Sequence, residues 1–90
     1  MTSDMLHEAQ LREIGKWSAR SYSEVASMDF SIPVTYEGKV DEGVYEVEVV
    51  LCEKNEDFIQ IMISVSSGGL SSFFPPSHSL VFHCDGRVDA

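Results

Sequence analysis

The side chains that could do chemistry in this 90-residue chain are few, and their spacing does not suit them to act together. Imidazole and thiolate groups, which zinc prefers as ligands, occur at five positions: His7, Cys52, His78, His83 and Cys84. His83 and Cys84 are adjacent in an expected strand, so their side chains point to opposite faces and suit neither one metal ion nor a thiol–imidazole pair. Neither cysteine belongs to a CxxC pair. The sequence therefore predicts no metal site and no cofactor.

Residues for a hydrolase or a phosphate-binding loop are also incomplete. The candidate triad of a serine hydrolase comes from one short stretch of chain: Ser77 or Ser79, His78 and Asp85. The chain has no GxSxG elbow to expose a nucleophile and no evident oxyanion hole. Gly68-Gly69 lacks the lysine and the following helix that a phosphate loop requires. We predict no catalytic residues and interpret the chain as a non-catalytic protein.

Charge gives the clearest statement about partners. With 15 acidic and 6 basic residues the net charge is −9. Nucleic-acid binding needs clustered lysine and arginine to displace counterions from the phosphate backbone. The composition therefore argues against a nucleic-acid partner, and it favours a basic protein partner.

Targeting signals and membrane spans are not evident. Asp4 and Glu8 stand where a signal peptide needs positive charge followed by an apolar run. The longest apolar stretch, Phe58 to Val65, is well short of the ~20 residues of a membrane helix. We expect a cytoplasmic protein with no membrane partner, in which Cys52 and Cys84 are reduced and buried.

The first part of the chain predicts one amphipathic helix from Ser3 or Asp4 to about Ser27. At about 100° per residue, one arc of this helix is apolar and the opposite arc is charged. The apolar arc holds Leu6, Leu11, Ile14, Trp17, Tyr22 and Val25, and the charged arc holds Glu8, Arg12, Glu13, Lys16 and Arg20. Gly15 weakens the middle of the helix, which we expect to bend or break there.

From Phe30 onward the apolar period changes to two, which is typical of strands. Phe30 to Tyr36 predicts a first strand, which Pro33 restricts to an edge or to an irregular extension. Glu37 to Gly43 predicts a polar turn. The next strand puts Tyr45, Val47, Val49 and Leu51 on one face. A charged turn from Lys54 to Asp57 leads into a third strand, with the expected pairs Leu51–Ile59, Val49–Ile61 and Val47–Ile63.

The last third of the chain predicts a long loop and one more hairpin. Ser66 to Ser79 forms the loop, Leu80 to Cys84 a fourth strand, and Asp85-Gly86 a tight turn into a short return strand. The fold class is α+β, with an N-terminal amphipathic helix packed on one face of a four- to five-stranded antiparallel meander. Residues 1–90 form a single domain, whose helix lies across the row of Tyr45, Val47, Ile61 and Ile63.

The face of the sheet away from the helix is the candidate interaction surface, because it is neither cleanly polar nor cleanly apolar. It carries Val44, Val50, Cys52, Phe58 and Met62 together with Glu46, Glu48, Gln60 and Ser64. The long loop adds Phe73 and Phe74 beside two stiffening prolines. We predict partner binding at Val50, Phe58, Met62, Phe73 and Phe74, and a homodimer through the first three.

Two alternatives remain open. The acidic balance and the order of helix then strands over residues 5 to 65 resemble those of bacterial type III secretion chaperones, although the chain has no room for the later helices of that family. The resemblance implies a cytosolic dimer that binds unfolded segments of its partners, and it assigns no residues. The other alternative is a small-ligand-binding protein or enzyme, with a pocket between the helix and the 66–79 loop near Tyr22 and His78.

Overall fold

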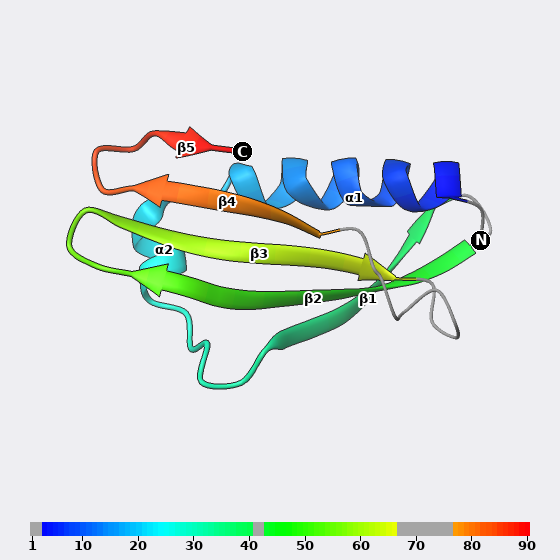
Figure 1. The fold of residues 1–90 in the computed structure, drawn as a ribbon, viewed down its shortest axis with the longest axis horizontal. Coiled ribbons are helices and arrows are strands. Elements are labelled where there is room, and N and C mark those ends of the chain that lie inside the picture. Colours follow the sequence, from blue (N-terminus) through cyan, green and yellow to red (C-terminus); the bar gives the residue numbers. More distant parts are fainter. Residues whose placement is uncertain (1–2, 41–42, 67–76) are drawn as a thin grey trace.

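A long helix lies across one face of a twisted antiparallel sheet (Figure 1). The computed structural model describes residues 3–40, 43–66 and 77–90. Within them the elements are α1 (Ser3–Ser18), α2 (Tyr22–Ala26), β1 (Val34–Val40), β2 (Gly43–Lys54), β3 (Phe58–Ser66), β4 (Ser77–His83) and β5 (Val88–Asp89). The sheet order β1-β2-β3-β4-β5 follows the sequence, and each neighbouring pair is antiparallel. The predicted α+β meander is confirmed.

The predicted single helix is two helices, and the break is not at Gly15. α1 ends at Ser18 and α2 begins at Tyr22. Ser21 between them has extended backbone angles, and its hydroxyl accepts a hydrogen bond from the Glu24 amide at 3.1 Å. A serine that caps a new helix competes with continuation of the old one, which explains the position of the break. The short α2 then places Val25 in the core at one end of the sheet.

β1 runs through the stretch that predicts a turn. Glu37, Gly38 and Lys39 are strand residues, and the strand begins at Val34 rather than at Phe30. Gly38 pairs with Tyr45, and a Cβ at Gly38 would overlap the Tyr45 ring. The glycine therefore marks a close approach of an aromatic ring and not a turn. Of the two alternatives predicted for this segment, the structure shows the edge strand, which begins directly after Pro33.

The β2–β3 hairpin has the predicted inward face with a different register. Val49 pairs with Ile63 and Leu51 with Ile61, so each β2 residue meets a partner two positions later than predicted. β2 continues through Lys54, which the prediction places in the turn, and a bulge at Cys52 absorbs the extra residue. Because the shift is even, the buried face is unchanged.

The core lies between the helices and the inner face of the sheet. Its buried side chains are Ala9, Trp17, Val25, Val40, Tyr45, Val47, Val49, Ile59, Ile61, Ile63, Val65, Leu80 and Phe82. The row of four β2 and β3 residues that we expected beneath the helix is part of this set. Leu11 is 57% exposed, contrary to the prediction. β4 begins at Ser77, inside the predicted loop, and ends at His83.

We expect Val49→Asp to abolish folding, because Val49 is fully buried and a carboxylate there has no partner. The loss should be several kcal/mol, which is a large fraction of the stability of a small domain. Glu48→Lys changes the neighbouring outward-facing side chain and should fold normally. Far-ultraviolet circular dichroism compares the two variants, and equal helix and strand content in both would contradict the assigned inner face.

Candidate functional site

The most convergent polar groups in the described part of the chain surround Glu13 of α1. Its carboxylate is fully buried and accepts hydrogen bonds from the hydroxyls of Tyr36 and Tyr45, each at 2.6 Å. The Trp17 indole donates to the Tyr36 hydroxyl at 2.7 Å, and the Lys16 ammonium lies 3.2 Å from the carboxylate. We call Glu13, Trp17, Tyr36 and Tyr45 the buried network. The sequence pattern placed Glu13 on the water-facing arc, and that prediction is wrong.

The rotation of α1 about its own axis explains why Leu11 and Glu13 were both predicted on the wrong side of the helix. Two residues apart on a helix lie about 200° around its axis, so Leu11 and Glu13 cannot both face the sheet. Two tyrosine hydroxyls converge on Glu13 from β1 and β2. In the strand pattern both tyrosines count as apolar residues, so the pattern does not show that their hydroxyls converge on α1. The periodicity of α1 itself does not show it either.

Ionisation of the buried network follows from its hydrogen bonds. Burial raises the pKa of Glu13, but donation from Tyr36, Tyr45 and Lys16, with the positive charge of Lys16, outweighs burial and holds the pKa below 4.5. Burial and the bond to Glu13 raise the pKa of Tyr45 to about 12 and also raise that of Tyr36. The network is thus one carboxylate held by two neutral phenols. A group sealed from solvent in this way supports the fold and offers no site for a substrate.

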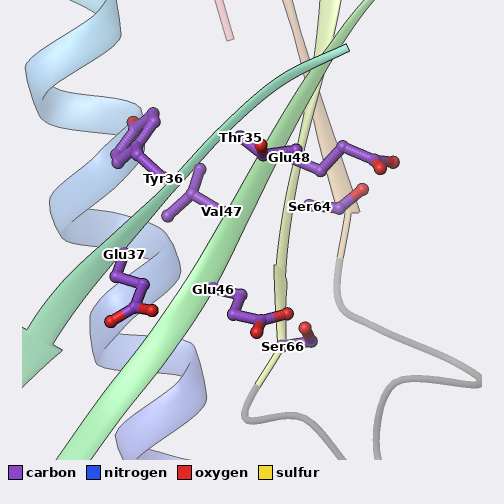
Figure 2. Close-up of a pocket in the computed structure, with 8 residues that line it drawn as sticks. All are labelled: Thr35, Tyr36, Glu37, Glu46, Val47, Glu48, Ser64 and Ser66. Carbon is purple, nitrogen blue, oxygen red and sulfur yellow. The ribbon is translucent and has the colours of Figure 1, made fainter.

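An open cleft lies on the opposite side of the sheet, which we call the outer face. Its volume is about 630 Å³, and Figure 2 shows its lining across three strands. The residues are Thr35, Tyr36 and Glu37 of β1, Glu46, Val47 and Glu48 of β2, and Ser64 and Ser66 of β3. Tyr36 projects toward the helix, whereas Glu48 and Ser64 project away from it. We call this the acidic cleft.

The three carboxylates of the acidic cleft are exposed, and none has an ion-pair partner among the described residues. Glu37 and Glu46 stand directly opposite each other on β1 and β2. Glu48 pairs with Thr35 on one side and Ser64 on the other, and Ser64 shares a 2.9 Å hydrogen bond with Ser77. The cleft is therefore negative and lined with hydroxyls, which suits a cationic group.

An apolar band adjoins the acidic cleft on the same face. It consists of Val50, Phe58 and Met62, all half-buried. Val50 and Met62 are directly opposite each other on β2 and β3, and the Phe58 ring lies 6.4 Å from that of His83. The structure thus places three of the five predicted partner-binding residues on the same face of the sheet, with Val50 opposite Met62 and Phe58 four residues before Met62 on β3. Phe73 and Phe74 lie outside the described residues.

The other candidate residues do not form a site in the described part of the chain. Ser77 and Ser79 face outward on β4 while His78 between them faces the helix side, beside Ile63. His78 is at the start of β4 and Tyr22 begins α2, which lies near the end of that strand (Figure 1). No group of three or more histidine, cysteine or carboxylate side chains among residues 3–40, 43–66 and 77–90 is arranged to hold a metal ion.

Cys52 and Cys84 carry free thiols and are exposed, whereas we expected them to be buried. Cys52 is the bulged residue of β2, and Cys84 follows β4 in the turn to β5. Both positions are at the ends of strands, where the alternation of inward and outward side chains breaks down. In the described part of the chain, no helix is long and apolar enough to cross a membrane.

Comparison with known proteins gives no relative. No family model, no curated protein and no solved structure matches this chain significantly. The surfaces described above are therefore interpreted from their own chemistry.

Stability should depend on pH through the buried network. A carboxylate with a lowered pKa stabilises the fold above its unfolded pKa of about 4.5, and this contribution is lost as the pH falls through the lower folded value. Tyr45 acts at the other limb: its contribution is complete below pH 10 and is lost as the pH rises toward about 12. Urea unfolding of wild type and Glu13→Gln across pH measures both effects.

We expect Glu13→Gln to lose about 1–3 kcal/mol at neutral pH, because two buried hydroxyls lose a charged acceptor, and to show a flatter acid limb. Hydrogen bonds from backbone amides also lower the pKa values of Asp29 and Asp85, but these groups are the same in both proteins. Glu56→Gln, an exposed change in the β2–β3 turn, is the control. An acid limb in Glu13→Gln as steep as that of wild type would contradict this assignment.

Proposed function

We propose that this protein is a non-catalytic protein-interaction module that binds a basic partner through the outer face of its sheet. One observation carries the proposal: Glu37, Glu46 and Glu48 line an open cleft without any ion-pair partner among the described residues. Lysine or arginine side chains of a partner would neutralise them. The net charge of −9 attracts such a partner over a longer range.

The grouping of the outer carboxylates lowers the stability of the free protein. Like charges directly opposite on neighbouring strands destabilise a sheet by roughly 0.2–1 kcal/mol, and Glu37 and Glu46 are such a pair. The chain satisfies its buried carboxylate at Glu13 with three donors, whereas these outer carboxylates have none among residues 3–40, 43–66 and 77–90. Local rules of stability are most often broken where a protein binds something.

The apolar band gives the partner a second kind of contact. Val50, Phe58 and Met62 offer contact area beside the charges, in the way that interfaces place apolar centres within polar surroundings. Cys52 and Cys84 are exposed free thiols, which persist in a reducing compartment. We therefore assign the function to the cytoplasm.

Self-association is the second candidate use of the outer face. The band is half-buried within one chain, which limits the area that a symmetric dimer would cover, and two acidic clefts would repel each other. Sedimentation of wild type and Phe58→Ser at low and moderate salt tests it. A dimer requires wild type to associate more strongly as salt rises and Phe58→Ser to remain monomeric, and monomers in all four samples exclude it.

Glu46→Lys should separate binding from stability. The substitution converts a repulsive cross-strand pair with Glu37 into an attractive one, so we expect unfolding stability equal to or up to about 1 kcal/mol above that of wild type. Partner binding should fall, because the cleft loses a carboxylate and gains a cation. Quantitative affinity capture from native lysate, with wild type and variant on parallel supports, measures the loss.

The control is Glu56→Lys, which makes the same change of charge in an exposed turn away from the acidic cleft. Proteins retained by wild type and by Glu56→Lys, eluted by moderate salt and absent from Glu46→Lys, would support the proposal. Equal retention of the same proteins by all three baits would refute it, as would turnover of a small substrate by the purified protein.

A further inference from the structure

The edge of β1 that no other described strand pairs with borders the acidic cleft, and it offers a partner backbone groups as well as charge. β1 is the first strand of the sheet, and Thr35, Tyr36 and Glu37 at its centre all line the cleft. We propose that an extended segment of the basic partner adds to the sheet as a strand alongside β1, with its lysine or arginine side chains over the acidic cleft. This inference rests on the proposed function and specifies how the partner binds.

Backbone hydrogen bonding along β1 identifies the groups that face away from the sheet. In an antiparallel edge strand, alternate residues direct their N–H and C=O groups toward the neighbour and away from it. The Lys39 carbonyl accepts a 2.6 Å hydrogen bond from the Arg12 guanidinium of α1, so it points away from β2. By alternation, Thr35 and Glu37 also direct both backbone groups outward. Neither makes an outward hydrogen bond within the described part of the chain.

Both ends of this open stretch are closed. Pro33 precedes β1 and has no N–H to donate. Arg12 occupies the carbonyl at Lys39. Proline and covering side chains are common protections of edge strands. Between them lie two donors and two acceptors that have no outward partner in the described part of the chain. An added strand of a few residues matches this length.

Side-chain alternation then predicts the chemistry of the added strand. On the outer face of the sheet, side chains of the added strand would lie beside Thr35 and Glu37, within reach of Glu46. Cationic side chains suit these positions. Its other side chains would lie beside Val34 and Tyr36, which are half-buried on the helix side of the sheet. Apolar residues suit them. The structure thus points to a partner segment in which basic and apolar residues alternate.

A second copy of this chain is a poorer occupant of the same edge. A symmetric antiparallel pair of β1 strands would bring two chains of net charge −9 together at Glu37, beside two acidic clefts. The negative charge at this edge disfavours pairing with a second copy of the chain, and the same charge attracts a basic strand.

The test uses three capped peptides in which lysine and valine alternate: one unmodified, one N-methylated at every lysine and one N-methylated at every valine. Only alternate residues of an added strand donate to β1, so N-methylation of one set should weaken binding about tenfold or more. N-methylation of the other set should have little effect. Calorimetry on the full chain measures the three affinities. Amide exchange at Thr35 and Glu37 should slow with the unmodified peptide.

Thr35→Pro removes one outward donor, which an edge strand tolerates, and should weaken the unmodified peptide when circular dichroism shows a native fold. The peptide comparison does not depend on that variant. Equal affinity of all three peptides, with all of them lost in Glu46→Lys, would overturn strand addition and leave charge-based binding in place. Failure of the unmodified peptide to bind would also overturn strand addition, while the lysate comparison judges the proposed function separately.

Discussion

The buried Glu13 carboxylate is the interaction on which the rest of the structure depends. A charge without exposure needs several donors at close range, and Tyr36, Tyr45 and Lys16 provide them. These contacts fix the rotation of α1, which turns Leu11 into water. They also require Gly38, because the Tyr45 ring crosses its position on the way to the carboxylate. One side chain thus couples the helix to the β1–β2 hairpin.

The two faces of the sheet treat acidic residues in opposite ways. On the inner side, one carboxylate is buried and every neighbour is arranged to satisfy it. On the outer side, Glu37, Glu46 and Glu48 are exposed and have no ion-pair partner among the residues that the structure describes, although two of them stand directly opposite each other. Exposed charges are screened and individually contribute little. Their grouping in the acidic cleft therefore adds little to the stability of the fold, and under the proposed function it serves to bind a basic partner.

The apolar periodicity of the sequence was sufficient to predict the architecture. It failed to predict contacts between side chains on different elements. Alternating Tyr45, Val47 and Val49 identified the inner face, and Pro33 limited the first strand to an edge or an irregular extension, of which the edge is observed. Glu13 was predicted on the wrong face because its partners are tyrosine hydroxyls distant in sequence. Gly38 was predicted in a turn because the sequence does not distinguish a turn glycine from one that makes room for an aromatic ring. Val50 and Met62 were predicted on the outer face and stand opposite each other there, with Phe58 on the same face of β3. Glu37 was missed because its stretch was interpreted as a turn.

The buried network also bears on how β1 can act as a template. Edge strands tend to fray, and ordering one on binding would reduce affinity. Here Tyr36 is held by Glu13 and Trp17, and Arg12 holds the Lys39 carbonyl, so α1 fastens the strand at two points. Glu37 lies between these two points and Thr35 directly before the first, so their outward backbone groups are already in strand geometry. If a basic segment adds there as proposed, it would meet a preorganised edge, and the interactions that stabilise the free protein would lower the entropic cost of binding.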